Sequence, residues 1–205
     1  MKRFDVIVVG GGHAGIEAGL AVTRLGLKAL LVTTNFERIG YMSCNPSIGG
    51  LGKGHMVHEI DILGGQMGVA ADATCIQFKR LNSRKGPAVR GSRAQCDKDL
   101  YCAHMKETMF SAPGLELLES EIKSLILEDG KCVGVVTEDG AHIASHAVII
   151  TTGTFMNVVM HSGLKKTSGG RVGERSTRVL AEQLREHGFE SSRLKTGTPP
   201  RIDGR

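Results

Sequence analysis

The sequence predicts an α/β fold with a Rossmann-like dinucleotide-binding unit near its start. The first observation behind this prediction is a glycine-rich turn at residues 10–15, between a buried strand and a helix. The second is a hairpin-rich β-meander at residues 122–145. The third is a further buried strand that follows the meander and ends in a glycine turn at Gly153.

The first unit of the chain reads as strand, turn, helix and strand. Residues 5–9 form a short apolar run rich in β-branched side chains, which is typical of a strand buried on both faces. Residues 16–25 predict a helix that ends at Gly26. Residues 28–32 predict the next buried strand.

The turn itself predicts dinucleotide binding, because Gly10, Gly12 and Gly15 fit G-x-G-x-x-G in the required context. The first glycine permits the tight turn, the second lets a pyrophosphate approach, and the third allows close helix–strand packing. The pyrophosphate would lie at the helix N-terminus, where free N–H groups and the helix dipole favour an anion. The acidic residue expected to bind the ribose is missing, and Thr33 stands in its place. The choice between NAD and NADP therefore cannot be made on this position.

Helices are predicted on both sides of residue 90. Apolar residues at helical spacing predict a helix from about residue 55 to residues 64–65 or a little beyond; they are Met56, Val57, Ile60, Leu63 and Met67. Residues 97–110 predict a further helix. A last amphipathic helix is expected at residues 176–187, with Ser176 as a candidate N-cap and Gly188 as its end.

The β-meander is predicted from its turns. Strands are expected at residues 122–127, 131–137 and 141–145, separated by Asp-Gly pairs that are typical of hairpins. Residues 147–152 predict a separate, fully buried strand. In two-dinucleotide flavoproteins, such a meander leads to a buried strand whose T-G turn returns to the nucleotide site. This order favours FAD as the dinucleotide.

We therefore expect two regions in the chain. Residues 1–155 are predicted to form a FAD-binding domain of the two-dinucleotide flavoprotein type, including the meander. Residues 156–205 are expected to begin a further or inserted domain that is cut short, because no closing element follows the prolines at 199–200.

The formal net charge of +5 is unevenly distributed. Residues 156–205 carry 10 basic and 5 acidic side chains, and residues 79–98 hold seven basic side chains and one acid. Two interpretations remain open at this point. The basic patches either attract a polyanionic partner, or they are solvated faces and cofactor-phosphate contacts, which charge alone favours.

The cysteines, the hydropathy and the histidines indicate where the protein works and whether it binds a membrane or a metal. The five cysteines include no C-x-x-C pair, so free thiols in a reducing cytosol are expected. No apolar run approaches the length of a membrane span, so no membrane association is expected. The histidines offer only the helical pair His55 and His58, so no metal is expected.

Cys44 lies in a second glycine-rich loop, at residues 40–54. A nearby helix N-terminus and Lys53 could lower the pKa of its thiol and make it reactive. It could equally be a small residue that fills a tight turn, and local sequence leaves both interpretations open. The other cysteines stand in strand or helix patterns and are expected to be buried and inert; they are Cys75, Cys96, Cys102 and Cys132. Gly52-Lys53 is not a phosphate loop, because Gly54 replaces the required Ser or Thr.

Motifs along nearly the whole chain resemble one family. These are GGGHAG at residues 10–15, SCNPSIGG at 43–50, GKGH at 52–55, LNSRKGPAVR at 81–90, SGGR at 168–171 and LKTGTPPRID at 194–203. Together and in this order they resemble the MnmG/GidA family of tRNA uridine 5-carboxymethylaminomethyl modification enzymes. Members of that family are much longer, so the chain resembles their N-terminal portion.

The resemblance implies FAD-dependent modification of C5 of the wobble uridine in tRNA. It implies NADH as the reductant, methylenetetrahydrofolate as the one-carbon donor, and the GTPase MnmE as a partner in a cytoplasmic complex, with the enzyme as a homodimer. Flavin would supply the electron chemistry, and protein groups would position it and move protons. Such an N-terminal portion is expected to be inactive alone, because the family's second functional cysteine and its NAD segment would lie beyond Arg205.

Family FAD contacts map onto Gly10, Gly11, Gly12, His13, Ala14 and Gly15, onto Ile122, and onto Thr177, where the family has serine. The family's loop cysteine maps onto Cys44, with an implied role as acid/base or transient nucleophile near the flavin. Within residues 79–98, Arg84, Lys85, Arg90 and Arg93 are candidate contacts for tRNA phosphates, or for flavin phosphate. Two alternatives are a related FAD- and folate-dependent tRNA uridine methyltransferase of the TrmFO type and a non-catalytic nucleotide-binding module.

Overall fold

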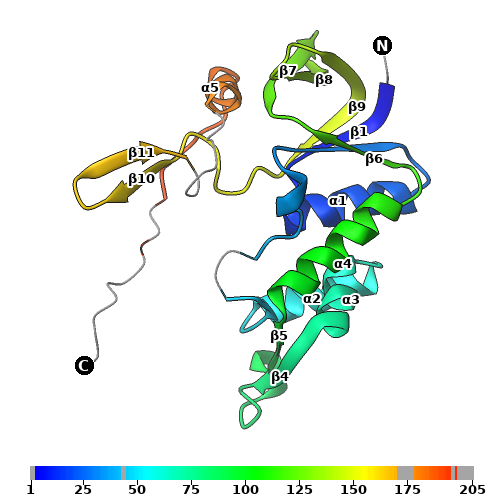
Figure 1. The fold of residues 1–205 in the computed structure, drawn as a ribbon, viewed down its shortest axis with the longest axis vertical. Coiled ribbons are helices and arrows are strands. Elements are labelled where there is room, and N and C mark those ends of the chain that lie inside the picture. The colour runs from blue at the N-terminus through cyan, green and yellow to red at the C-terminus, as the bar shows by residue number, and fades with distance from the viewer. Residues whose placement is uncertain (1–2, 43–44, 170–177, 195–196, 198–205) are drawn as a thin grey trace.

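The computed structural model describes residues 3–42, 45–169, 178–194 and 197. Its centre is a six-stranded sheet with strand order β6-β2-β1-β9-β8-β7 (Figure 1). Four of the strands are parallel neighbours: β1 (Arg3–Val9), β2 (Ala29–Thr33), β6 (Leu115–Glu119) and β9 (His142–Ile150). The remaining two, β7 (Ile122–Glu128) and β8 (Lys131–Thr137), extend the sheet in antiparallel fashion. The α/β fold predicted from the sequence is confirmed.

Successive side chains along β1 and β2 point to opposite faces of the sheet, so the hydrophobic core consists of two clusters, one on each face. Val8 and Leu31 face one side, where they pack with side chains of α1 (His13–Arg24) and α4 (Lys98–Ser111). Ile7, Val9, Leu30 and Val32 face the other side and pack against residues of the meander. Because both faces are covered, β2 is buried along its whole length. This explains why both strands read as continuous apolar runs.

A second unit is inserted between β2 and α4. It contains a three-stranded antiparallel sheet of order β3-β5-β4, with β3 (Ser47–Gly49), β4 (Cys75–Leu81) and β5 (Gly91–Cys96). Two helices, α2 (Lys53–Ile62) and α3 (Gln66–Thr74), pack on this sheet, and the 3-10 turns η1 (Phe36–Arg38) and η2 (Pro87–Val89) lie in the connections. Figure 1 shows the β4–β5 hairpin at the opposite end of the molecule from β7 and β8.

The helix expected from about residue 55 to residues 64–65 is confirmed as α2, but Met67, which was counted with it, belongs to the separate helix α3. The break falls at Gly64, whose φ of 84° is accessible mainly to glycine. The apolar spacing did not mark a buried stripe either, since Met56 is 61% and Leu63 77% exposed. Gly54 is the only buried residue of α2. The short strands β3, β4, β5 and β6 gave no pattern clear enough to predict.

The separate strands expected at residues 141–145 and 147–152 are one strand, β9. Its first half pairs antiparallel with β8, and residues from Ala144 onward pair in parallel with β1. No glycine or proline separates Ser145 from Ala147, so the backbone stays extended and changes partner rather than turning. One strand therefore joins the meander to the parallel sheet.

After β9 the chain forms a hairpin of β10 (Val159–Ser162) and β11 (Lys165–Ser168), and then α5 (Val179–Glu186). The predicted N-cap Ser176 lies outside the described residues, while the helix ends before Gly188 as expected. α5 packs on β7: the Gln183 amide accepts from Leu125 N at 2.7 Å and donates to Leu125 O at 3.0 Å. This side chain therefore completes the backbone hydrogen bonds of an edge strand.

Candidate nucleotide-binding site

The glycine-rich turn lies at the carboxyl edge of the parallel sheet, between β1 and α1. Gly10 has φ of 116°, and its N–H donates to Val32 O at 2.8 Å. Gly12 is the N-cap of α1, and no side chain caps this helix. The first turn also contains no acidic residue. Uncapped N–H groups at a helix N-terminus favour an anion at this position.

The glycines of the turn divide between two roles. A Cβ on Gly15 would lie 1.8 Å from Gly10 O, and a Cβ on Gly10 would lie 2.4 Å from Thr151 O. Both glycines are therefore required by contacts within the protein. A Cβ on Gly12 would meet nothing within 4 Å. The absence of a side chain at Gly12 thus leaves open space directly over the helix N-terminus, where a bound group could approach the backbone.

Three other segments converge on this edge. Thr151, just after β9, donates from its hydroxyl to Val9 O at 2.9 Å. Thr33, the last residue of β2, is buried, and its Oγ1 lies 2.8 Å from the position of a Cβ on Gly11. Ser120 N donates to Thr33 O at 2.9 Å, so the chain enters the meander at the same edge. Sequence reasoning did not include Thr151 among the site residues, although the T-G turn that contains it was the available signal.

Ile122 begins β7 two residues after this contact and is 2% exposed. Its side chain belongs to the core cluster on the meander side of the sheet, so only its backbone is available to a ligand. Thr177 and Cys44 lie outside the described residues. Their predicted roles stay predictions.

The second half of the loop that contains Cys44 includes regular secondary structure. Residues 47–49 form β3, which pairs with β5 through Gly49 and Arg93. A Cβ on Gly49 would lie 2.2 Å from Ser92 O, so this glycine serves strand packing. Gly50 and Gly52 have open space at the Cβ position. Only part of this glycine-rich segment is therefore free to approach a ligand.

At the start of that loop, Tyr41 contacts two cations. Lys98 Nζ donates to Tyr41 Oη at 2.7 Å and lies 4.1 Å from the ring centroid, and Arg38 lies over the ring at 4.3 Å. The hydrogen bond from Lys98, followed by that from Arg38, lowers the pKa of the phenol below its usual value. Sequence reasoning missed this cluster, because residues 41 and 98 meet only in the folded chain.

His13 is the first residue of α1, and its ring stacks in a tilted arrangement on Tyr101 of α4, with centroids 5.6 Å apart. Burial lowers the pKa of His13 below 6.5, so the imidazole is neutral at pH 7. Burial raises the pKa of Tyr101 above its usual value.

Glu17, one turn after His13, accepts from Gln66 N at 2.9 Å and from Met67 N at 2.6 Å. It therefore caps α3 and fixes the inserted unit to α1.

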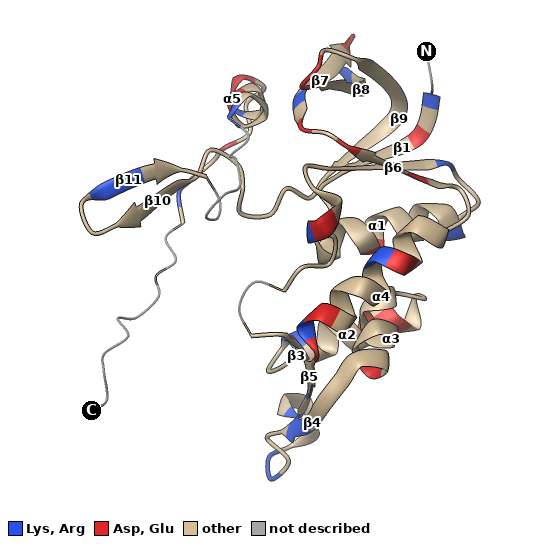
Figure 2. Cartoon of the chain, viewed as in Figure 1, with Lys and Arg blue, Asp and Glu red and all other residues tan. Residues whose placement is uncertain are grey.

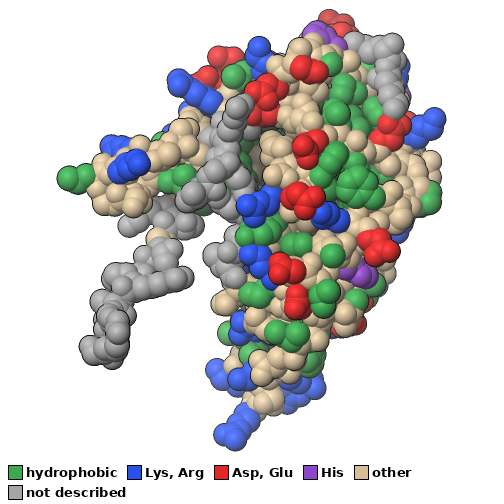
Figure 3. Space-filling view, viewed as in Figure 1, with side chains coloured by type: hydrophobic (Ala, Val, Ile, Leu, Met, Phe, Trp, Pro, Cys, Tyr) green, Lys and Arg blue, Asp and Glu red, His purple; other side chains and the backbone are tan. Residues whose placement is uncertain are grey.

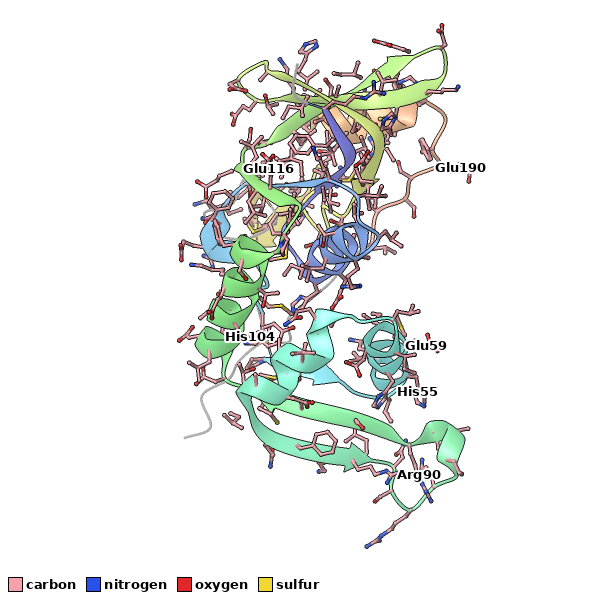
Figure 4. All side chains as sticks on the ribbon, turned by 90° about the vertical axis from the view of Figure 1, so that its right-hand side faces the viewer. His55, Glu59, Arg90, His104, Glu116 and Glu190 are labelled. Carbon is pink, nitrogen blue, oxygen red and sulfur yellow. The ribbon has the colours of Figure 1, made fainter. Side chains whose placement is uncertain are left out.

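The candidate phosphate-binding cations lie far from this turn. Arg84 and Lys85 are exposed at the tip of the β4–β5 hairpin, where basic residues gather along the ribbon in Figure 2 and basic side chains on the surface in Figure 3. Arg90 Nε donates to Lys85 O at 2.9 Å, which places this side chain at the same tip, as Figure 4 shows. Arg93 lies on the strand instead, where its Nε donates to Ser47 Oγ at 3.3 Å. The structure thus brings three of the four together and separates them from the glycine turn.

The remaining cysteines differ in burial. Cys96 is 1% exposed and burial raises the pKa of its thiol, as expected for an inert residue. Cys75, Cys102 and Cys132 are only partly buried, so the expectation of burial was wrong for them. Burial still raises the pKa of the Cys102 thiol. Within the described ranges, no helix is long and apolar enough to cross a membrane.

Comparison with known sequences gives a consistent result along the chain. The profile of the family described as "Glucose inhibited division protein A" matches residues 5–205. The "tRNA uridine 5-carboxymethylaminomethyl modification enzyme MnmG" of Bdellovibrio bacteriovorus is 65% identical over 201 residues, which cover 98% of this chain and 31% of the relative. The protein of the same description from Geobacter sulfurreducens is 54% identical over 203 residues, covering 99% and 32%. The chain spans about a third of the length of these curated relatives.

Solved structures give the same family and the same fold. GidA of Aquifex aeolicus superposes with a TM-score of 0.89 at 47% identity, covering 92% of this chain and 31% of that one. The "GidA-related protein" of Thermus thermophilus superposes at 0.63 with 20% identity, covering 91% and 69%. The latter likeness concerns the fold alone. The predicted Rossmann-like flavoprotein type is thereby confirmed.

Proposed function

Because the chain belongs to the glucose inhibited division protein A family, we propose that it is the FAD-binding part of an enzyme that modifies C5 of the wobble uridine in tRNA. The modification proposed is the addition of a carboxymethylaminomethyl group. The curated relatives carry this activity in their names and are about three times as long, so the activity is proposed for the whole protein to which such a chain corresponds.

The observation that carries the proposal is the open space over Gly12. The protein itself requires Gly10 and Gly15, whereas nothing in the described residues requires a glycine at position 12. A pyrophosphate at this position would accept from the uncapped N–H groups at the start of α1. The residues proposed to hold FAD are Gly10 to Gly15 through their backbone, with Ile122 and Thr177.

FAD, when bound, would supply electron transfer to and from a one-carbon unit and the uridine. NADH is the proposed reductant and methylenetetrahydrofolate the proposed one-carbon donor. Cys44 is the proposed acid/base or transient nucleophile. A cytoplasmic homodimer that works with the GTPase MnmE is the proposed assembly.

The basic hairpin tip is the proposed contact for tRNA. Asn82 Nδ2 donates to Val89 O at 3.0 Å and Lys85 N donates to Asn82 O at 2.8 Å, so internal bonds hold the tip in shape. Arg84 and Lys85 project into solvent from this framework. Exposed cations on a fixed support suit the phosphates of an anticodon stem-loop better than those of FAD, since the tip lies far from the glycine turn (Figure 4).

The whole protein provides the direct test. We expect it to purify with the absorption spectrum of bound flavin, and to modify wobble uridine when tRNA, NADH, methylenetetrahydrofolate, glycine and the GTPase partner are supplied. A colourless protein that gains no flavin on reconstitution would refute the cofactor assignment. Activity at a different uridine would refute the substrate and favour a methyltransferase of the TrmFO type.

The tRNA contact has a separate test. Arg84→Ala combined with Lys85→Ala should weaken tRNA binding and reduce the slope of log K against log salt by about 1 to 2, because each phosphate contact contributes about 0.7 to 0.9. Lys131→Ala is the matched control, since Lys131 is exposed on β8 at the other end of the molecule. An unchanged slope in the double variant would remove the hairpin tip from the interface.

A further inference from the structure

Two side chains with shielded polar atoms meet at the start of α1, next to the glycine turn. Tyr101 is fully buried, and its ring contacts the imidazole of His13 at the start of α1. Among the described residues, no hydrogen-bond partner reaches either His13 Nε2 or Tyr101 Oη, and both atoms are shielded from solvent. Two buried polar atoms without partners, on side chains whose rings are in contact, are unusual, because an unpaired buried polar group destabilises the fold.

The chemistry of the two atoms is complementary. A phenol can donate one proton, and a neutral imidazole has one acceptor nitrogen. His13 is neutral because burial lowers its pKa. The hydroxyl of Tyr101 also remains protonated, because burial raises its pKa. Either atom could donate to the other, but a phenol is the better donor and an imidazole nitrogen the better acceptor, so the favoured arrangement has Tyr101 Oη as donor and His13 Nε2 as acceptor.

We propose that Tyr101 is a positioning residue for the nucleotide site, whose hydroxyl donates through one water to Nε2 of His13 and fixes the first turn of α1. This inference rests on the proposed function only for its effect on FAD. The proposal also gives separate roles to the side chain and the backbone of His13. The imidazole, through its shielded Nε2, anchors the turn to α4, and the backbone N–H is the part that would face the cofactor.

The surroundings favour this neutral link. Glu17 on α1 is committed to the backbone of α3, and Cys96 on β5 is a buried thiol. Cys102 on α4 is a thiol whose pKa burial raises, and His104 on the same helix lies 3.1 Å from the Gln66 amide nitrogen through its Nε2. None of these groups supplies a counter-ion to a protonated His13.

The first test is the tautomer of His13 in the wild-type chain labelled with 15N-histidine. Two-bond 1H–15N correlation should show Nδ1 protonated and Nε2 unprotonated at pH 7, with the resonance assigned by its loss in His13→Gln. In Tyr101→Phe, which deletes only the hydroxyl, this preference should disappear. A protonated Nε2 in the wild type, or a tautomer unchanged in Tyr101→Phe, would overturn the proposal. The wild-type spectrum decides the matter even if the variant does not fold.

The second test is a double-mutant cycle on urea unfolding. Tyr101→Phe and His13→Leu should each raise the unfolding constant about tenfold, since each leaves a buried polar atom unpaired. The double variant should also show about a tenfold rise, rather than the hundredfold expected for independent sites. His13→Gln, which keeps an acceptor near the position of Nε2, should recover most of the loss. Additive effects would refute the link.

The third measurement connects the pair to the cofactor. In the whole protein, Tyr101→Phe should raise the Kd for FAD by roughly three- to tenfold. Ser111→Ala, which deletes an exposed hydroxyl at the far end of the same helix, should leave it unchanged. An equal effect of both variants on the Kd would refute the positioning role. If no form of the protein binds FAD, the proposed function fails. The His13 tautomer and the double-mutant cycle would still test the hydrogen-bonded link between Tyr101 and His13.

Discussion

Substitution of Gly12 by alanine should remove FAD binding and leave the fold intact. The φ of −77° and ψ of −179° at Gly12 are accessible to alanine, and its Cβ would touch nothing in the protein. Alanine is a poorer N-cap than glycine by about 0.5–1 kcal/mol. The smaller entropy of the unfolded chain offsets about 0.4–1 kcal/mol of this. The midpoint of thermal unfolding should therefore change by less than about 2 °C.

The effect on FAD should be much larger. A methyl group over the helix N-terminus would displace the pyrophosphate and remove two charge-assisted hydrogen bonds, each worth about 1.5–3 kcal/mol. The loss of about 3 kcal/mol corresponds to an increase of Kd for FAD of about 100-fold or more. Quenching of flavin fluorescence in a titration of the apoprotein measures this Kd.

Gly15→Ala is the contrasting variant. Its Cβ would lie 1.8 Å from Gly10 O, so α1 must shift away from β1. Such overpacking costs about 2–3 kcal/mol and should lower the unfolding midpoint by roughly 5–10 °C even without cofactor. If Gly12→Ala bound FAD within threefold of the wild type, the pyrophosphate would not lie against Gly12, and the assignment of the two glycine roles would be wrong.

Three further outcomes are expected. Since burial lowers the pKa of His13 below 6.5, the unfolded chain takes up this proton first, and the free energy of unfolding should fall as pH drops below 6.5, by at most about 1.4 kcal/mol per unit. Urea titrations should show a shallower fall in His13→Gln; an identical fall would exclude His13 as its cause. Glu17→Gln should lower the unfolding midpoint by about 2–4 °C because α3 loses a charged cap, whereas Glu107→Gln on the exposed face of α4 should not, and equal shifts would contradict the capping role. Cys44→Ser should keep FAD but abolish uridine modification, and loss of FAD would instead make this cysteine structural.

The local sequence was sufficient to predict an element wherever its residues favour one conformation whatever their distant neighbours are. The apolar runs of β1 and β2 and the glycines between them require only neighbours in sequence, so the nucleotide-binding unit could be predicted in detail. The same holds for the hairpin turns at the Asp-Gly pairs, where φ is positive at both residues of the pair 129–130.

The local sequence failed to predict elements that form only by pairing with a segment distant in the chain. β3, β4 and β5 are short strands that exist because they pair with one another, and β9 continues because β1 replaces β8 as its partner. The apolar spacing of α2 misled because exposed and buried apolar residues look alike in a sequence.

The order of residues along the chain was enough to predict the glycine-rich turn between β1 and α1, the family resemblance and the basic character of residues 79–98. Folding added that these basic side chains form a tip remote from the turn, that Gly12 differs from Gly10 and Gly15, and that His13 meets Tyr101. These facts could not be predicted, because a glycine role or a ring contact is defined by atoms from segments far apart in the chain. Those atoms become neighbours only when β1, β9, α1 and α4 pack together.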